Sequence, residues 1–367
     1  MSSEEAEMLP PAAVAALPLD DDNLLSEILL RLPPLPSSLP RASAVCRRWR
    51  SLASDPAFSR RFRLHHRRNP PLLGCFYGDY HQIHFEPTLE PPNRVPPRRL
   101  SLQADVGDRF WPLGSRHGLV LIFNETRLQF LVWDPVTGHQ HCIAIPREFD
   151  RIKAGISGAV LRSAARDIHF KVVLAVANDD NTVLASVYSS ETRVWGNLIT
   201  SIPFWKFFRP KVCTQPAVLV GDSLYWILRG GSECILEFDL QSESLAFIQM
   251  PVDRINVPCY TPMRADDGEL GLLSLTFTTA QLWKRKIDCD GTAPWGVART
   301  IELDKLLSLD SGEPTWIQGF AEDKNLVSLC AGNSNFTVQL ESLEFKKPSN
   351  PRMDRYFPFE SVYAAGI

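Results

Sequence analysis

The hydrophobic residues of this chain change their spacing near residue 70. Before that point they recur every three to four positions, which is typical of helices with one buried face. After it they occur in short runs separated by Gly, Pro, Asn and Asp, which is typical of strands joined by turns. The pattern therefore predicts two unlike parts, a short helical part and a much longer part built from strands.

The first predicted helix follows residues 20–23, whose Asp and Asn side chains place acceptors and negative charge at a helix N-terminus. Pro33-Pro34 ends it, because a residue before proline avoids the helical conformation. The apolar residues in between fall on one stripe, which comprises Leu24, Leu25, Ile28, Leu29 and Leu32. A helix of about ten residues with one apolar face is therefore expected.

A second helix is predicted over residues 37–52, since Ser37 or Ser38 can cap it and Pro40 is tolerated in a first turn. Four arginines lie off its apolar face, which comprises Ala42, Val45, Cys46, Trp49, Leu52 and Ala53. Asp55-Pro56 then opens a third helix, with Phe58 and Phe62 pointing inward. Three such helices hold more apolar groups than about 45 residues can bury alone. They either need a partner surface or form the first hairpin of a larger domain, and spacing alone does not decide.

Strand-like apolar runs fill the chain from Leu72 onward. They comprise residues 118–123, 130–133, 142–145, 170–177, 183–188, 217–220, 224–228, 235–238, 270–275, 326–330 and 336–340. A unit of about fifty residues repeats through them, with markers at Trp133, Tyr188, Phe238, Trp283 and Val338, spaced 55, 50, 45 and 55 apart, and a weaker unit around Phe85. This period, with about four strands per unit, is typical of kelch-type propeller blades, and the length allows about six. The competing arrangement is a pair of irregular β-sandwiches.

Composition narrows the class of protein. The net charge of −3 over 367 residues predicts no general attraction to nucleic acid. No apolar run approaches the ~18 residues that a membrane helix needs, and the N-terminus lacks the basic region of a secretory signal. The eight cysteines include no C-x-x-C pair, so neither a zinc site nor a disulfide framework is expected. We therefore expect an intracellular protein of the nucleus, the cytoplasm or both, with no metal and no cofactor.

Three local patterns could indicate further activity. The basic run over residues 60–68 could serve nuclear import or nucleic-acid contact, but a solvated end of the third helix is favoured. Gly221-Asp222-Ser223-Leu224 spells a hydrolase signature, yet it falls in a turn between two strands and not before a helix. His139 and His141 share one face of a strand beside Cys142, without a fourth ligand at metal spacing. None of the three is expected to be a site.

Four segments of the helical part carry a resemblance. They are Leu17-Pro18, then Ile28-Leu29-x-Arg31-Leu32-Pro33, then Val45-Cys46-Arg47-Arg48-Trp49, and finally Asp55-Pro56-Ala57-Phe58. Together they closely resemble the F-box, with one departure: three residues, 19–21, widen the gap after Leu17-Pro18. The resemblance implies binding to the Skp-type adaptor of a cullin–RING ubiquitin ligase.

The resemblance also implies which residues contact the adaptor. Apolar anchors at helical spacing, with an aromatic near the centre, are what such a docking surface requires. The implied set comprises Leu17, Pro18, Leu25, Ile28, Leu29, Leu32, Pro33, Leu39, Val45, Cys46 and Trp49.

The strand-rich part is similar to the F-box-associated domain of large plant families, especially those of grasses. The matching phrases begin at Ser115-Arg116-His117-Gly118, Trp133-Asp134-Pro135, Val187-Tyr188-Ser189, Leu224-Tyr225-Trp226, Leu236-Glu237-Phe238 and Gly319-Phe320-Ala321-Glu322-Asp323. Each phrase is short, but their order covers the whole part. The resemblance implies a platform that recognises a target protein, without indicating which target.

The expected fold is an α+β multidomain chain. A disordered acidic tail (1–16) precedes a three-helix F-box domain (17–66) and an all-β propeller-like domain of about six blades (67–367). The expected function is substrate recognition in an SCF-type ubiquitin ligase, with cullin and RING subunits reached through the adaptor, an unknown target and no catalysis. One alternative is an F-box protein that binds carbohydrate or a small ligand through Trp195, Trp205, Trp226, Trp283 and Trp316. A propeller enzyme would need His, Tyr and Cys converging at the blade centre, and the sequence shows no such set.

Overall fold

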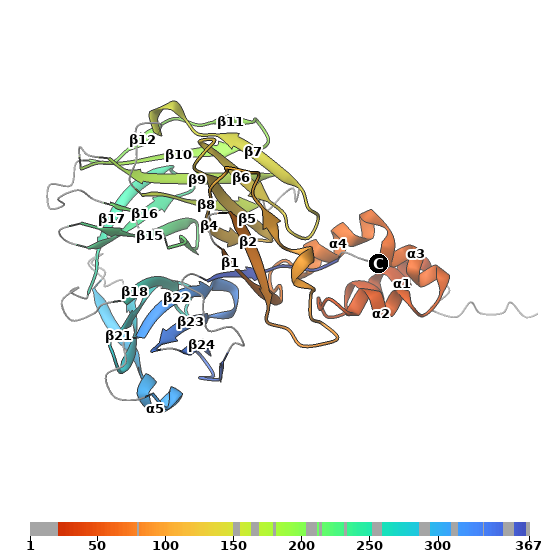
Figure 1. The fold of residues 1–367 in the computed structure, drawn as a ribbon. Coiled ribbons are helices and arrows are strands. Elements are labelled where there is room, and N and C mark those ends of the chain that lie inside the picture. Colours follow the sequence, from red (N-terminus) through yellow and green to blue (C-terminus); the bar gives the residue numbers. More distant parts are fainter. Residues whose placement is uncertain are drawn as a thin grey trace, which may run out of the picture.

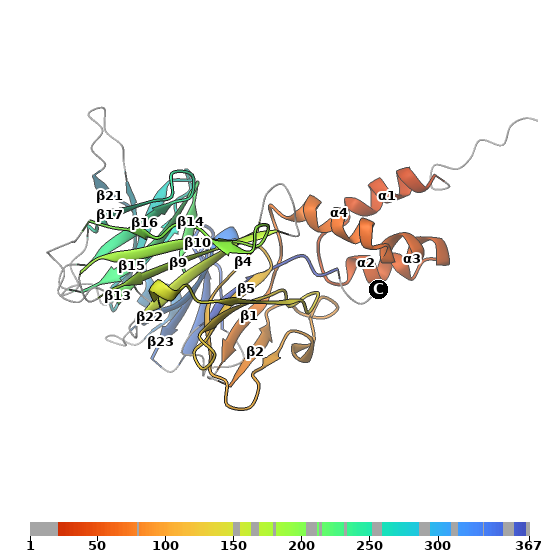
Figure 2. The ribbon, with the colours of Figure 1, turned by 90° about the horizontal axis from the view of Figure 1, so that it is seen from above.

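The computed structural model describes the chain from residue 21 to residue 364 with several gaps. The described residues are 21–78, 81–149, 155–162, 169–178, 181–202, 211–212, 215–230, 233–251, 259–285, 294–309, 315–332, 334–347 and 356–364. They form a small helical module and a β domain, which lie side by side (Figures 1 and 2). The predicted tail over residues 1–16 lies outside the described residues. Among the described helices, none is long and apolar enough to cross a membrane.

The helical module consists of α1 (Asp22–Leu30), α2 (Ser38–Ser43), α3 (Arg47–Ser54) and α4 (Pro56–His66). The expected start signals are confirmed. The Asp21 carboxylate accepts a hydrogen bond from the backbone N–H of Asn23 at 2.8 Å and caps α1. The Asp55 carboxylate caps α4 by accepting from the N–H of Phe58 at 3.1 Å, with Pro56 at the first helical position.

The expectation of one continuous second helix is wrong, because α2 and α3 are separate and the module has four helices. The N–H groups of Ala44 and Val45 bond back to the carbonyls of Pro40 and Ala42, which closes α2 with a turn. Cys46 is then extended (φ −160°, ψ 172°), so α3 has to begin anew. The break leaves Val45 exposed, whereas one continuous helix would have placed it in line with Trp49.

The β domain is a six-bladed propeller, which confirms the predicted architecture and excludes the β-sandwich pair. Each blade is an antiparallel sheet of four or five strands. The first three blades consist of β26 (Phe357–Glu360), β1 (Leu72–Gly78), β2 (Gln82–Pro87) and β3 (Leu102–Gln103); of β4 (Phe110–Arg116), β5 (Leu119–Asn124), β6 (Gln129–Trp133) and β7 (Gln140–Ala144); and of β8 (Ile156–Arg162), β9 (Phe170–Ala177), β10 (Val183–Ser189), β11 (Val194–Trp195) and β12 (Ile199–Thr200).

The remaining three blades follow in chain order. They consist of β13 (Lys211–Val212), β14 (Val218–Val220), β15 (Ser223–Arg229), β16 (Cys234–Asp239) and β17 (Ser244–Gln249); of β18 (Cys259–Arg264), β19 (Leu270–Leu275), β20 (Thr279–Arg285) and β21 (Trp295–Glu302); and of β22 (Thr315–Ala321), β23 (Leu326–Ala331), β24 (Ser334–Gln339) and β25 (Phe345–Lys346). Short helices accompany them, namely η2 (Pro97–Arg99), η3 (Arg147–Phe149), α5 (Leu303–Leu307) and η4 (Glu322–Lys324).

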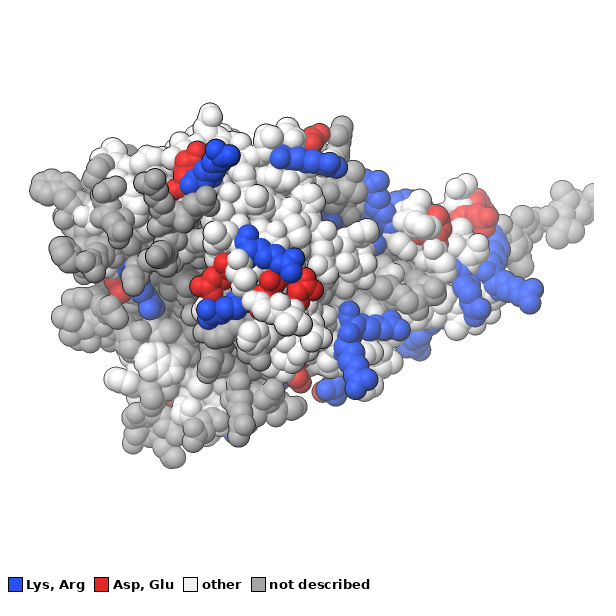
Figure 3. Space-filling view, turned by 45° about the horizontal axis from the view of Figure 1, so that its top comes forward, with Lys and Arg blue, Asp and Glu red and all other residues white. Residues whose placement is uncertain are grey.

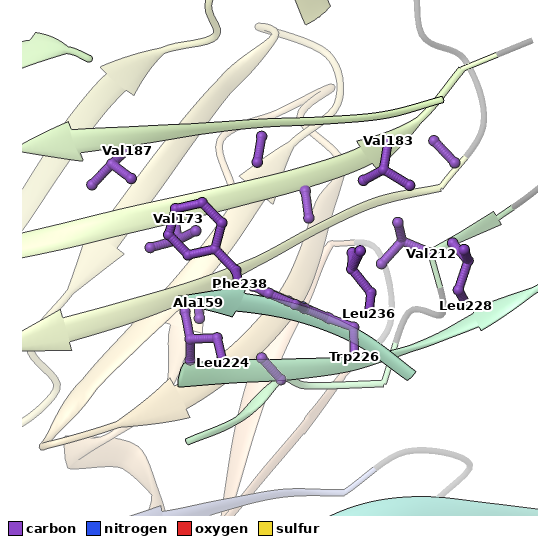
Figure 4. Packing of buried hydrophobic residues seen from close by; sticks show 14 of the residues in the cluster. Ala159, Val173, Val183, Val187, Val212, Leu224, Trp226, Leu228, Leu236 and Phe238 are labelled. Carbon is purple, nitrogen blue, oxygen red and sulfur yellow. The ribbon is translucent and has the colours of Figure 1, made fainter. Parts of the chain in front are cut away.

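The predicted repeat corresponds to one structural position. All six marker residues lie on the third strand from the centre of their blade: Phe85, Trp133, Tyr188, Phe238, Trp283 and Val338. Their apolar side chains pack in clusters that join neighbouring blades. Figure 4 shows Phe238 of the fourth blade beside Val173 of the third. The fifty-residue period is therefore the period of the blades.

The two ends of the chain close the propeller together. The last strand, β26, pairs with β1 and forms the inner edge of the first blade, with Phe357 opposite Phe76. The ring of Phe359 meets that of Phe76 edge-on, with 5.0 Å between ring centroids. Because this blade combines the first strands with the last one, the circle of sheets closes only when the C-terminal segment is in place.

Candidate functional site

The core of the helical module holds several residues that were expected on its docking surface. Leu25, Leu29 and Leu39 are fully buried there, together with Phe58 and Phe62 of α4. Leu25 and Leu29, which the resemblance implies as adaptor contacts, are therefore not on the surface of the module. Leu25 and Leu29 point inward, because α4 packs across α1 and covers this side of the stripe.

A different set of apolar side chains remains on the outside of the module. Leu24 and Ile28 lie one turn apart on α1 and are 42% and 39% exposed, while Val45 in the turn before α3 is 62% exposed. An ion pair from Arg48 Nε to Asp22 Oδ1 (2.7 Å) holds the start of α3 beside the start of α1. We call Leu24, Ile28 and Val45, with the exposed neighbour Cys46, the docking face.

The other residues of the predicted set take intermediate places. Pro33 is exposed, whereas Leu32 and Trp49 are half-buried and pack against the core from its rim. Leu17 and Pro18 lie outside the described residues. Leu24 was absent from the predicted set although it belongs to the α1 stripe; its side of that stripe faces outward, which the spacing alone could not indicate.

The helical module is joined to the propeller by the segment that follows β26. Val362 is buried in the core of the module, and Ala364 packs against that core. The N–H of Ser361 donates to the carbonyl of Pro71 at 3.2 Å, and Arg99 Nη1 donates to the Tyr363 hydroxyl at 3.0 Å. The chain that closes the propeller thus also completes the core of the helices, as the blue segment beside them in Figure 1 shows.

Further hydrogen bonds join the two parts. Ser37 Oγ donates to Asn93 Oδ1 at 2.7 Å, and Arg67 Nη2 donates to the backbone carbonyl of Arg162 at 2.7 Å. Lys324 Nζ donates to Asn69 Oδ1. These contacts come from three separate stretches of the β domain, so the helices are held in one orientation relative to the propeller.

The basic run over residues 60–68 is partly used inside the molecule. Arg61 pairs with Glu27 on α1 at 2.7 Å, and Arg67 bonds the β domain as described above. A ring nitrogen of His66 lies 2.9 Å from the carbonyl of Leu30, and burial lowers the pKa of His66. Figure 3 shows acidic as well as basic side chains on the helical module in that view.

A cavity of about 250 Å³ lies where the inner strands of five blades end. It is lined by the C-terminal ends of β4, β14, β18, β22 and β26, and we call it the central cavity. Two of the family-like phrases, at residues 115–118 and 319–323, meet there. This meeting follows from the propeller, in which each inner strand ends beside the next.

Charged side chains meet in the lining of the central cavity. Arg116 Nε donates to Glu322 Oε2 at 3.2 Å, and the side chains of this pair are only 9% and 18% exposed. Arg116 Nη2 also donates to the carbonyl of Ala217 at 2.6 Å. Arg264 Nη2 bonds the backbone carbonyl of Glu322 at 3.1 Å and lies 3.6 Å from the carboxylate of Asp323. Both arginines therefore already have acidic partners.

Glu360 differs from these paired groups. Burial, and after it the negative charge of Asp323, raises the pKa of Glu360 to about 8. Its Oε2 accepts from the N–H of Asp323 at 3.3 Å, whereas Oε1 has no hydrogen-bond partner among the described residues. Beside it, burial and the charge of Arg116 lower the pKa of His117 to about 3. At neutral pH the cavity thus holds a protonated carboxyl group and a neutral imidazole.

The other candidate patterns are structural where they are described. Gly221 (φ +57°) forms the turn between β14 and β15, as expected. A ring nitrogen of His141 lies 3.1 Å from the Tyr188 hydroxyl, and no cluster of metal-ligating side chains occurs within the described ranges. Trp226 is buried between blades, Trp195 and Trp283 are half-buried, Trp316 is 47% exposed, and Trp205 lies outside the described residues.

Comparison with solved structures finds chains of low sequence identity. The extracellular domain of a one-component system from B. thetaiotaomicron is 8% identical with a TM-score of 0.42, over 76% of this chain and 36% of that one. The Dos1 propeller is 10% identical (TM-score 0.41, 76% and 68% covered), and SapL1 lectin in complex with alpha methyl fucoside is 9% identical (TM-score 0.40, 82% and 99% covered). This chain spans about a third of the first of these. No curated protein matches it.

Two family models match the sequence. An F-box-like model matches residues 16–65, which include α1, α2, α3 and all of α4 except its last residue, His66. A second model, described as F-box protein AT5G49610-like, beta-propeller, matches residues 113–343, which is more than half of the chain. The chain therefore belongs to the family of AT5G49610-like F-box proteins, with an F-box-like module preceding the β-propeller.

Proposed function

We propose that this protein is the substrate-recognition subunit of an SCF-type ubiquitin ligase. The observation that carries the proposal is the exposed docking face on an F-box-like module that precedes a propeller of the F-box-protein family. Large apolar side chains in contact with water are costly, and a contiguous group of them is typical of a protein-binding surface. The partner would be a Skp-type adaptor, which leads to the cullin and RING subunits.

The division of the module into core and surface supports this role. Leu25, Leu29 and Leu39 hold the helices together, while Leu24, Ile28 and Val45 stay exposed. In this account the buried leucines of the implied set act indirectly, by keeping the exposed ones in place. The half-buried Trp49 and Leu32 would contribute at the rim.

The propeller would hold the target protein. The contacts of Ser37, Arg67 and Val362 hold the helical module in one orientation, so a target bound to the propeller would keep a defined position relative to the ligase. Ubiquitin transfer would be carried out by other subunits, and this chain would raise the local concentration of the target. The protein would act inside the cell, in the nucleus, the cytoplasm or both.

The target half of the proposal is tested by affinity purification of the full chain from cells in which the proteasome is blocked. A target is expected to bind the wild-type bait and to carry ubiquitin there. It should still bind the Ile28→Asp variant, but without ubiquitin. The reason is that Ile28 is exposed on the docking face, so its substitution leaves the propeller unchanged. If no ubiquitin-bearing protein distinguishes the two baits, the proposal fails.

A further inference from the structure

The central cavity has a charge pattern that neither the fold nor the family explains. Glu322, Asp323 and Glu360 bring three carboxyl groups to its wall, against the two guanidinium groups of Arg116 and Arg264. The two arginines interact with residues 322 and 323, and neither of them pairs with Glu360. Lys324 is the cation whose charge acts on Glu360, and its ammonium group is bonded to Asn69. One carboxyl group in the wall therefore lacks a cationic partner among the described residues.

Two polar atoms of the lining are also unpaired. Within the described part of the chain, Glu360 Oε1 and Ser115 Oγ are buried and make no hydrogen bond. Both residues belong to inner strands, β26 and β4, whose ends form the wall of this one cavity. A buried polar atom without a partner destabilises the folded state, so a ligand that supplies a hydrogen-bond donor here would gain a favourable interaction.

The size and charge of the cavity select the ligand. At about 250 Å³ it falls below the range of roughly 300–1,000 Å³ that drug-sized ligands occupy, so it suits a single extended side chain. An anion would face Glu322 and Asp323 and would compete for arginines that are already bonded. A cationic group with N–H donors would instead donate to the free oxygen of Glu360 and pair with its carboxylate, which is ionised in the bound state.

We propose that the central cavity binds one cationic side chain, a lysine ammonium or an arginine guanidinium, with Glu360 as its charge partner and Ser115 as a hydrogen-bond acceptor. That this side chain belongs to a bound target protein rests on the proposed function. The binding itself is a property of the cavity and is measurable without any other subunit.

Binding of a cation is coupled to the release of a proton. Free Glu360 is mostly protonated at neutral pH because its pKa lies at about 8, and a bound cation favours the ionised form. Affinity therefore rises with pH up to about 8 and then levels off. The charged and titratable groups that line the cavities on both sides of Glu360 are Arg63, Arg67, Arg116, His117, Asp134, Arg162, Arg264, Glu322 and Asp323.

The test uses the full chain and two capped amino acids, N-acetyl-lysine methylamide and its uncharged analogue N-acetyl-norleucine methylamide. Calorimetric titration at pH 7.5 is expected to show saturable binding of the lysine probe and none of the norleucine probe. Glu360→Gln should weaken lysine binding at least tenfold. The glutamine has the same shape as the glutamate side chain, and Glu360 itself is mostly uncharged at neutral pH, so the variant should fold. Glu344→Gln, an exposed site on the sixth blade, is the matched control and should bind like the wild type.

The same titration has outcomes that overturn the proposal. The proposal is overturned if the two probes bind equally, or if the wild type and Glu360→Gln bind the lysine probe equally. It is also overturned if the lysine probe does not bind at about 10 mM. In the wild type, affinity should rise about tenfold from pH 6.5 to 7.5, and a pH-independent affinity would contradict the role of Glu360. Putrescine serves as a free small cation, and tighter binding of putrescine than of the capped lysine would overturn the assignment to a protein side chain. This titration does not involve the adaptor, so its outcome is independent of whether the docking face binds the adaptor.

Discussion

Val362 lies with Phe62 in one buried cluster, although Phe62 belongs to the fourth helix and Val362 to the last described segment of the chain. The residues directly before Val362 form β26, the strand that closes the propeller. Closure of the propeller and completion of the helical core are therefore one structural event. The helices do bury their inner faces, but they need the other end of the chain to do so.

Removing the side chain of Val362 should loosen the helices without opening the propeller. Val362→Ala deletes two buried methyl groups and is expected to cost about 2 kcal/mol of local stability. Hydrogen exchange should become faster in α1 and α4, with little change in the strands of the third and fourth blades. The exposed residue Val194 offers the matched control, Val194→Ala, which should leave exchange in the helices unchanged.

Shortening Phe359 should destabilise the whole β domain. The ring is fully buried against Phe76 and Phe85 where the chain ends close the first blade, so Phe359→Ala is expected to cost about 3–5 kcal/mol. Denaturant unfolding followed by tryptophan fluorescence measures the loss. Phe345→Ala removes a half-exposed ring on an outer strand and should cost much less; equal losses would argue against the closing role of β26.

The buried pair of Arg116 and Glu322 should show strong coupling. Arg116→Met leaves the Glu322 carboxylate without its main partner in a buried site, at a cost of about 3–5 kcal/mol. Adding Glu322→Gln removes the stranded charge and should restore part of that loss. A double-mutant cycle from urea unfolding measures the coupling, and additive losses would show that the pair contributes little.

Glu360 should make the folded state less stable as pH rises. Its pKa is about 8 in the folded chain and close to 4.5 when unfolded, so the folded state binds more protons between these values. The contribution of Glu360 to the free energy of unfolding therefore falls with rising pH, by at most about 1.4 kcal/mol per pH unit.

The window from pH 6.5 to 8 isolates this effect. Below pH 6.5, His117 makes the free energy of unfolding rise with pH, which opposes the effect of Glu360. The reason is that the pKa of His117 lies near 3 in the folded chain, so the unfolded state binds the His117 proton more readily. Comparing denaturant midpoints of the wild type and Glu360→Gln across this window is the measurement. The variant should gain stability relative to the wild type as pH rises, and parallel curves would exclude the assigned pKa.

Much of the fold could be predicted from the sequence, because helix starts and blade repeats depend on residues that are close together in the chain. Asp21 and Asp55 mark helix starts through single side-chain hydrogen bonds, and markers such as Trp133 and Phe238 recur because each blade repeats one packing position. Apart from β14, which falls in the predicted run 217–220, the inner strands were not predicted. Their sequences are interrupted by small and polar residues, such as Gly114 and Ser115 in β4, because one side of these strands faces the central cavity.

The candidate sites depended on contacts between distant parts of the chain and were harder to predict. Spacing showed that Leu25 and Ile28 share an apolar stripe, but only the packing of α4 decides that Leu25 is buried while Ile28 is exposed. Likewise, Glu360 looks ordinary in the sequence. Its pKa is raised because the end of β26 is buried and, after that, because it lies beside Asp323, a position that the chain reaches only through the closure of the propeller.

The exposed face of the helical module is proposed to bind a Skp-type adaptor. The most direct measurement is the affinity of the full chain for purified adaptor, for the wild type and for the double variant Ile28→Asp and Val45→Asp. Both side chains are exposed, so folding should be retained, and two charges on the docking face should lower affinity at least a hundredfold. Val194→Asp, an equally exposed valine on the propeller, is the control and should bind as the wild type does. Undiminished binding by a folded double variant, or no binding by the wild type, would contradict the account.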